Sequence, residues 1–343
     1  MSYFKQTTRM AKRLGDWLRD RTIFKKLVPG DQSFLGILCQ NDEEMETAFQ
    51  DLIGRIQFES KLKITKLRIG LVLEHSFHLS LEARLTDTGT IKAKMCPMTI
   101  DMWGPSGPFG EMTLPELKVH PNGTPITIDY QLVEIINWNA LQVFLEHLLH
   151  DEKVNLDLID GVAEIKSKPL KKGYRPIYFT RGVAMNGMHD AAFAVKKAEI
   201  TANPPTCDDV KGDRAGLKVR FRVKNPSPVE LSFGWCAFEI RNEEGELFAQ
   251  LKGMLDIKIK YYDVQLCGIA NKDVKLVKGK TRLIGLRCSG AGWCDGIIKS
   301  INVPVTDVWK MLKALGMDYD TPDPPSPDYF RWNGRWFKKG TWI

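Results

Sequence analysis

The chain has 343 residues, of which 43% are hydrophobic and 27% charged, and its formal net charge is +7. This length accommodates about two domains, and the composition is that of an ordinary globular protein rather than a disordered or fibrous one. The uncharged stretch from Ile135 to Leu145 is well below the ~18 residues that a spanning helix needs. We therefore expect no transmembrane helix.

The positive charge is concentrated near the two ends of the sequence. Residues 1–28 carry a net charge of +6 and residues 331–343 carry +4, which leaves −3 for everything between them. A protein that binds nucleic acid needs clustered Lys and Arg on its folded body to neutralise phosphates. We therefore do not expect nucleic acid as a partner.

Residues 1–30 are predicted to form a basic amphipathic helix, with apolar residues at helical spacing and cations mostly on the opposite arc. Such a helix can lie in the headgroup region of an anionic membrane. The alternative is that its apolar stripe packs on the adjoining domain. The candidate membrane-surface residues are Lys5, Arg9, Lys12, Leu14, Trp17 and Leu18. A second helix is expected at residues 42–56, with Asn41 as its N-cap.

From residue 67 onward the hydrophobic period changes from helical to two. Residues Leu67, Ile69, Leu71 and Leu73 alternate with other residues, as do those from Phe77 to Leu85, which predicts strands with one buried face. Further strands are expected at residues 91–102, 112–119, 124–136 and 153–165, with a helix at 137–149. We assign residues 31–168 to a first β-sandwich domain.

The same pattern returns 138 positions later. This offset sets Leu79, Leu81, Ala83 and Leu85 against Leu217, Val219, Phe221 and Val223, and it sets Ile100 and Met102 against Phe238 and Ile240. A shared register across two turns indicates a duplicated domain, which we place at residues 177–318. Many short strands with regular turns favour antiparallel sandwiches. The expected fold is therefore mainly β, with two tandem immunoglobulin-like antiparallel β-sandwiches and a few flanking helices.

The run from Val219 to Ile257, with Asn225-Pro226-Ser227-Pro228 between two strands, resembles the late-embryogenesis-abundant type 2 or WHy sandwich. Four further segments resemble a fungal family of unknown function that is built from tandem copies of this sandwich. They are Gly107–Gly110, Leu114–Leu117, Ile126–Glu134 and Asn139–Leu149. The resemblance covers roughly residues 60–305. It implies a scaffold that binds lipid chains between its sheets. Members of that family resemble membrane-tethered proteins with a spanning helix, where this chain has its charged N-terminal segment.

Residues 319–343 form a Pro-rich linker and a tail in which aromatic and basic residues alternate. This pattern suits a membrane interface, a docking strand or single-stranded nucleic acid. Because the body of the protein carries no basic excess, we favour docking or membrane contact. The candidate residues are Trp332, Arg335, Trp336, Lys338 and Lys339.

The sequence contains no catalytic, cofactor-binding or metal-binding motif that we recognise. His147 and His150 lie one turn apart on a predicted helix, but no third ligand is evident, so we predict no metal site. The seven cysteines are odd in number and scattered, which indicates reduced thiols and a cytoplasmic location. Cys288 and Cys294 are close enough in sequence to pair if they are oxidised, although we interpret them as structural.

These observations predict a non-enzymatic binding or scaffold protein. The candidate partners are a lipid or another apolar small molecule, an anionic intracellular membrane that it contacts peripherally, and a protein. One alternative is a small-molecule isomerase or cyclase whose pocket lies between the two β domains. Another is a purely structural protein–protein interaction module. No cofactor is expected.

Overall fold

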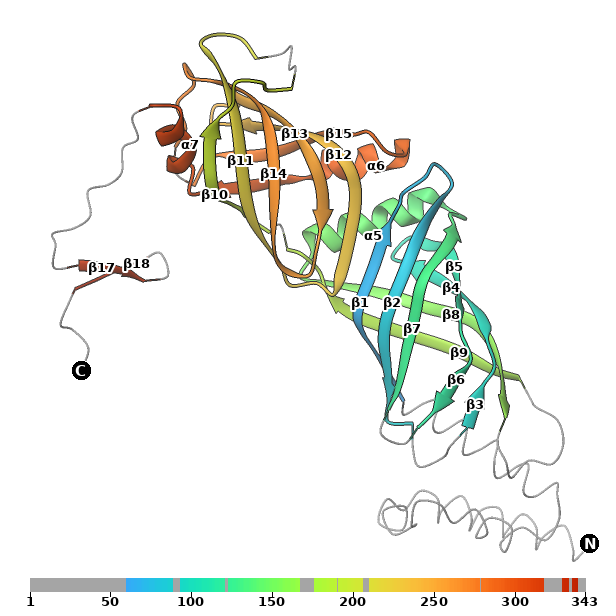
Figure 1. Cartoon of the computed structure of the whole chain (residues 1–343). Helices are drawn as coiled ribbons and strands as arrows, with labels where there is room; N and C mark the ends of the chain where they lie inside the picture. The colour runs from blue at the N-terminus through green and yellow to red at the C-terminus, as the bar shows by residue number, and fades with distance from the viewer. Residues whose placement is uncertain are drawn as a thin grey trace, which may run out of the picture.

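The computed structural model describes residues 60–88, 93–120, 123–166, 176–189, 191–205, 210–277, 279–317, 329–332 and 335–338. The helices expected at residues 1–30 and 42–56 lie outside these ranges, as does most of the linker and tail. The described part is mainly β, in two strand groups that lie end to end (Figure 1).

The N-terminal strand group contains β1 (Lys61–Gly70), β2 (Ser76–Thr86), β3 (Ala93–Met95), β4 (Met98–Gly104), β5 (Gly107–Leu114), β6 (Leu117–Val119), β7 (Thr124–Glu134), β8 (Lys153–Lys166) and β9 (Pro176–Asn186), with α5 (Trp138–His150) between β7 and β8. In this group β7, β2 and β1 pair side by side, while β5, β4, β8 and β9 pair in a second sheet. The buried residues of β2 are the alternating set from Phe77 to Leu85, which confirms the predicted inward face.

The C-terminal strand group contains β10 (Phe193–Ile200), β11 (Arg214–Asn225), β12 (Val229–Arg241), β13 (Leu247–Ile257), β14 (Lys260–Asn271), β15 (Arg282–Cys288) and β16 (Asn302–Thr306), with α6 (Gly292–Ser300) between β15 and β16 and α7 (Trp309–Ala314) after β16. These strands close on themselves, because β13 pairs with both β14 and β12 and β10 pairs in parallel with β16. A separate hairpin joins β17 (Tyr329–Trp332) and β18 (Arg335–Lys338).

Strand pairing repeats between the two groups in the order that the 138-residue offset predicts. In the first group β2 lies between β1 and β7, and in the second β11 lies between β10 and β14. Likewise β4 pairs with β5, and β12 pairs with β13. The helices break the repeat, because α5 follows β7 whereas α6 follows β15.

Two details differ from the expectations. Leu71 and Leu73 were expected on a buried strand face, but β1 ends at Gly70 and both side chains are exposed in the turn before β2. The second unit was expected to begin at residue 177, but β9 pairs along β8 of the first group, from Pro176 to Asn186. The C-terminal strands therefore begin after β9, which belongs to the first group by its pairing with β8.

The two strand groups are joined by hydrogen bonds as well as by the chain. β1 pairs in parallel with the first residues of β12, from Leu67↔Val229 to Ile69↔Leu231. The turn between β1 and β2 contacts the start of α6, where Glu74 accepts a hydrogen bond from the backbone N–H of Gly292 (3.0 Å) and the indole N–H of Trp293 donates to the Leu73 carbonyl (3.0 Å). This carboxylate serves as a cap for orphan N–H groups of α6.

The Asn225-Pro226-Ser227-Pro228 segment is the turn between β11 and β12. The buried Asn225 side chain donates to the carbonyls of Val229 (2.9 Å) and Lys258 (3.1 Å) and accepts from the N–H of Ser227 (2.9 Å). Because Lys258 lies in the connection between β13 and β14, one amide fixes two neighbouring turns. The motif is therefore structural, as an Asx turn that satisfies buried backbone groups.

Two glycines allow β13 and β14 to approach closely. A Cβ atom at Gly268 would overlap the carbonyl oxygen of Gln250, and one at Gly253 would overlap that of Gln265. At both positions the obstacle is backbone, which a side-chain rotation cannot relieve. Glycine is thus required for this crossing.

Replacement of Gly268 by alanine should lower the free energy of unfolding by at least about 2 kcal/mol, because the added methyl group forces the two strands apart. Urea denaturation, followed by circular dichroism, measures the change. Gly70→Ala is the matched control, since a Cβ there meets nothing closer than 3.6 Å. Equal destabilisation by the two substitutions would show that the β13–β14 approach is not as tight as described.

Replacement of Asn225 by alanine should cost about 2–4 kcal/mol of stability, because it leaves the carbonyls of Val229 and Lys258 and the buried N–H of Ser227 without this partner. Thermal and urea denaturation provide the measurement. Asn155→Ala, on the exposed side of β8, is the control and should change stability by less than about 0.5 kcal/mol. A neutral Asn225→Ala variant would contradict the role assigned to this turn.

Candidate functional site

The candidate site is a surface groove that exists because β13 and β14 diverge. They pair only from Ala249↔Ala270 to Lys252↔Cys267. Beyond that point β13 continues along β12 to Ile257, while β14 continues along β11 from Lys260. A solvent-open groove of about 700 Å³ follows the divergence. Its lining residues are Pro205, Trp235, Lys252, Gly253, Met254, Asp256, Lys258, Tyr261, Tyr262, Asp263, Gln265 and Cys267.

The sides of the groove carry exposed apolar side chains. Trp235 is 59% exposed, Met254 is 48% exposed and Tyr261 is 66% exposed. Trp235 and Met254 are register partners on β12 and β13, so their side chains lie on the same face of the sheet. Large apolar groups that remain exposed beside a groove are typical of a surface that binds a partner or ligand.

Tyr262 differs from its neighbour Tyr261 because it is buried, with 8% of its surface exposed, yet it still lines the groove. Burial raises the pKa of its phenol above the ordinary range, and the nearby charge of Asp256 raises it further. The hydroxyl therefore stays protonated at neutral pH. Among the residues that the structure describes, no hydrogen-bond partner is assigned to this hydroxyl, so it can donate a hydrogen bond into the groove.

The carboxylates of the groove are already paired with cations. Asp263 lies 2.7 Å from Lys196 and 3.3 Å from Arg222, and the hydrogen bond from Lys196 is the main cause that lowers the pKa of its carboxyl group. Asp256 lies 3.4 Å from Lys258 and 3.7 Å from Arg68. An ionised and paired carboxylate is a poor general base or acid at neutral pH. The groove is thus better suited to binding than to proton transfer.

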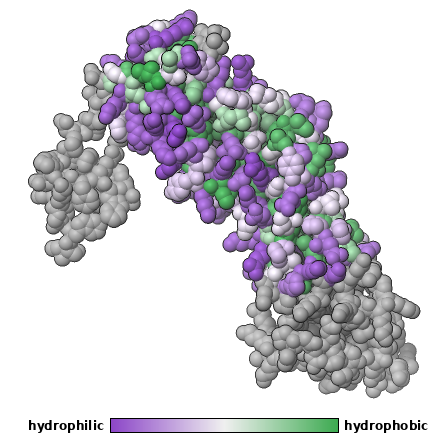
Figure 2. Space-filling view, viewed as in Figure 1, coloured by the Kyte–Doolittle hydropathy of each residue, from purple (hydrophilic) through white to green (hydrophobic). Residues whose placement is uncertain are grey.

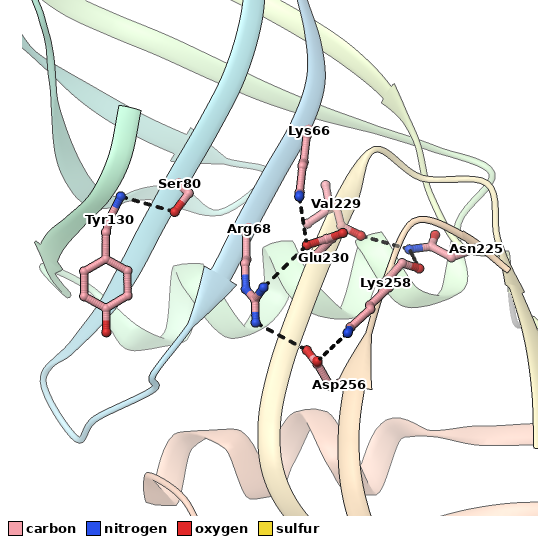
Figure 3. Close-up of polar contacts among 9 residues, drawn as sticks. All are labelled: Lys66, Arg68, Ser80, Tyr130, Asn225, Val229, Glu230, Asp256 and Lys258. Carbon is pink, nitrogen blue, oxygen red and sulfur yellow. Dashed lines mark hydrogen bonds and ion pairs between the residues drawn. The ribbon is translucent and has the colours of Figure 1, made fainter. Parts of the chain in front are cut away.

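The Asp256 end of the groove is connected to the contact between the strand groups (Figure 3). Arg68 of β1 bridges Asp256 (3.7 Å) and Glu230 of β12 (3.9 Å), and Lys66 lies 3.6 Å from the same Glu230 carboxylate. Glu230 is buried, whereas Arg68 is partly exposed. A buried carboxylate needs such cations to compensate for its lost hydration, so the N-terminal strand group helps to fix this side of the groove.

The groove carries polar as well as aromatic side chains. On the face shown in Figure 2, hydrophilic residues predominate and hydrophobic residues form smaller areas between them. The groove combines both kinds, because Lys252, Lys258 and Gln265 lie beside the aromatic residues. It is therefore a mixed site and not a purely apolar one.

The two histidines that lie one turn apart on α5 contact different partners. His147 lies 2.6 Å from the carboxylate of Asp151, and His150 lies 3.1 Å from the hydroxyl of Ser300 on α6. Within the described ranges no group of three or more His, Cys, Asp or Glu residues could hold a metal ion.

The β17–β18 hairpin contains the backbone of four tail candidates, Trp332, Arg335, Trp336 and Lys338. Lys339 and the membrane-surface candidates of residues 1–30 lie outside the described residues.

The groove residues were missed by sequence reasoning, although one signal was present. Trp235, Met254 and Tyr261 occupy outward positions of strands, where polar residues are usual. The divergence of β13 and β14 leaves no such local signal, because it depends on which neighbouring strand each of them follows.

No helix among the described residues combines the length and the apolar character that crossing a membrane requires.

Residues 107–240 match the model of a family described as "Protein of unknown function (DUF3712)". The match runs from the start of β5 almost to the end of β12 and so includes parts of both strand groups. No curated protein matches the chain. A solved glycosyl hydrolase family 2 member from Bacteroides cellulosilyticus DSM 14838 is similar over 62% of this chain and 26% of that protein, with 9% sequence identity and a TM-score of 0.18. Over residues 107–240 the chain is therefore similar to a family whose function is unknown.

Proposed function

We propose that the chain is a non-enzymatic binding protein, and that its groove holds an amphipathic small molecule such as a lipid. The observation that carries the proposal is the groove with the exposed apolar side chains of Trp235, Met254 and Tyr261, which the buried Tyr262 also lines. A phenol that stays protonated and lacks an assigned partner among the described residues supports a ligand that supplies the acceptor.

The two kinds of lining residue suggest how such a ligand would lie. Its apolar part would cover Trp235, Met254 and Tyr261, which removes exposed apolar area from water. Its polar headgroup would lie at the Tyr262 hydroxyl, near the cations Lys252 and Lys258. A wholly apolar molecule would take the charges of Lys252 and of the Asp256–Lys258 ion pair out of water, which disfavours it.

A further part of the proposal is supported by the strand pairing. The pairs formed among β1, β2, β4, β5 and β7 recur among β10 to β14. In this interpretation the chain consists of tandem immunoglobulin-like sandwiches of the late-embryogenesis-abundant or WHy type, as in the fungal family that it resembles. We also propose a cytoplasmic protein that contacts an anionic membrane peripherally through residues 1–30. An isomerase or cyclase with a pocket between the domains receives less support, because the groove lies on the C-terminal strand group and its carboxylates are paired.

Binding of the amphipathic probe 1-anilinonaphthalene-8-sulfonate should weaken about five- to tenfold in Trp235→Ala, because about 1 kcal/mol of apolar contact is lost. Tyr262→Phe removes only the hydroxyl and should weaken binding about three- to tenfold. A fluorescence titration of the folded proteins measures both. Trp138→Ala is the matched control, since Trp138 is 58% exposed and Trp235 is 59% exposed, but Trp138 lies on α5.

The outcome is unfavourable to the proposal if Trp138→Ala loses as much affinity as Trp235→Ala, or if Tyr262→Phe binds like the unmodified chain. Native mass spectrometry of gently purified protein supplies an independent result. A bound mass of a few hundred daltons in the unmodified chain, absent from Trp235→Ala, would support the groove as the natural site.

The membrane part of the proposal predicts that the full chain sediments with phosphatidylserine vesicles at low salt. Charge reversal of Lys5, Arg9 and Lys12 to Glu should abolish this, because each cation near an anionic surface contributes about 1 kcal/mol. Reversal of Lys272, Lys275 and Lys280 on the C-terminal strand group is the control. If both triple variants stay bound, or if the unmodified chain never sediments, residues 1–30 have no such role.

A further inference from the structure

Three cysteines meet at a place that is separate from the groove, where β12, β15 and α6 come together. Cys236 and Cys288 are register partners on the antiparallel strands β12 and β15. Cys294 lies in the first turn of α6, and its thiol donates a hydrogen bond to the sulfur of Cys288. The backbone N–H of Cys288 donates to the carboxylate of Asp295 (2.8 Å), which fixes the end of β15 against the helix.

The three thiols differ in access to solvent. Cys288 is half-buried, whereas Cys236 and Cys294 are buried. The Cys236 thiol is directed back along its own strand, to the carbonyl of Gly234 at 3.6 Å. Only Cys288 of this cluster is therefore both reachable from solvent and in hydrogen-bond contact with a second cysteine.

The same contacts separate the acidities of these thiols. The hydrogen bond from Cys294 and a second one from the backbone of Gly290 lower the pKa of Cys288. The pKa of Cys294 is raised, because that thiol is the donor to Cys288 and is also buried. Burial raises the pKa of Cys236 to about 12. Since the thiolate is the nucleophile, Cys288 is the first of the three to react.

We propose that Cys288 is a modification site for hydroperoxides and that its oxidised form is resolved by Cys294 into a disulfide. The Cys288 thiolate attacks one oxygen of hydrogen peroxide, the O–O bond breaks, and hydroxide leaves, so that the sulfur becomes a sulfenic acid. The sulfur of Cys294 then attacks that of Cys288 and displaces its hydroxyl group, which leaves as water with the proton of Cys294. The peroxide is reduced and the two thiols are oxidised, so no other reactant is needed.

The site adjoins the contact between the two strand groups. The first turn of α6 contains Cys294 and also the residues that bond the β1–β2 turn, Gly292 and Trp293. A disulfide would tie this turn covalently to the end of β15. The oxidation state of Cys288 and Cys294 is thereby coupled to the helix that the N-terminal strand group contacts. The thiol pair would act in this way whether or not the groove binds a ligand.

The full chain should be treated with hydrogen peroxide, its remaining thiols blocked with iodoacetamide, and its peptides mapped by mass spectrometry. We expect a Cys288–Cys294 disulfide as the first product. In Cys294→Ser the sulfenic acid should persist on Cys288 and be trapped by dimedone. In Cys288→Ser the disulfide should be absent, and loss of the Cys294 thiol should be slowed at least tenfold.

Cys267→Ser is the control, because Cys267 is also partly exposed but burial raises its pKa, and the substitution should leave the Cys288–Cys294 product unchanged. A second measurement uses the unmodified chain and follows the order in which iodoacetamide labels its cysteines in the folded, reduced state. Cys288 should be labelled before Cys267 and Cys96. The proposal is overturned if another cysteine is oxidised first, or if Cys236 instead of Cys294 forms the bond with Cys288.

Discussion

The structure depends on how the two hydrogen-bonding edges of β12 are used. One edge pairs with β13 over most of its length. The other edge is divided, because its first residues pair with β1 and its last residues pair with β15. A strand has only two edges, so the short stretch between Leu231 and Cys236 must end one pairing and begin the other. The bulge between Ser232 and Gly234, where Gly234 adopts a φ of 75°, lies within that stretch.

This division of β12 also determines where the chemistry lies. Glu230 belongs to the part that pairs with β1 and forms the charged contact with Lys66 and Arg68. Trp235 follows the bulge and is exposed at the groove, and the next residue, Cys236, faces Cys288 of β15. One strand thus supplies residues to the contact between the strand groups, to the groove and to the thiol cluster.

The sequence was informative wherever the signal was local. The period-two pattern located β2 and β7, the helical spacing located α5, and the 138-residue offset matched strands that pair alike. It failed where structure depends on distant partners. The pairing of β1 with β12 joins residues more than 150 positions apart, and no local period records it. Leu71 and Leu73 continue the alternation of β1 but have no sheet to cover them. The groove also depends on distant partners, since it forms where β13 and β14 follow different neighbouring strands.

The location of the groove bears on the expectation, drawn from the family resemblance, that ligands lie between the sheets. In the C-terminal strand group the interior is occupied by large side chains with no exposed surface, among them Phe221, Phe238 and Phe248. A ligand between the sheets would have to displace such residues from a close-packed core, at a cost of several kcal/mol. The close approach of β13 and β14 at Gly253 and Gly268 further closes this side of the interior. Tyr262 is buried where the same two strands separate, and it lines the groove. A ligand in the groove would therefore leave this core packed.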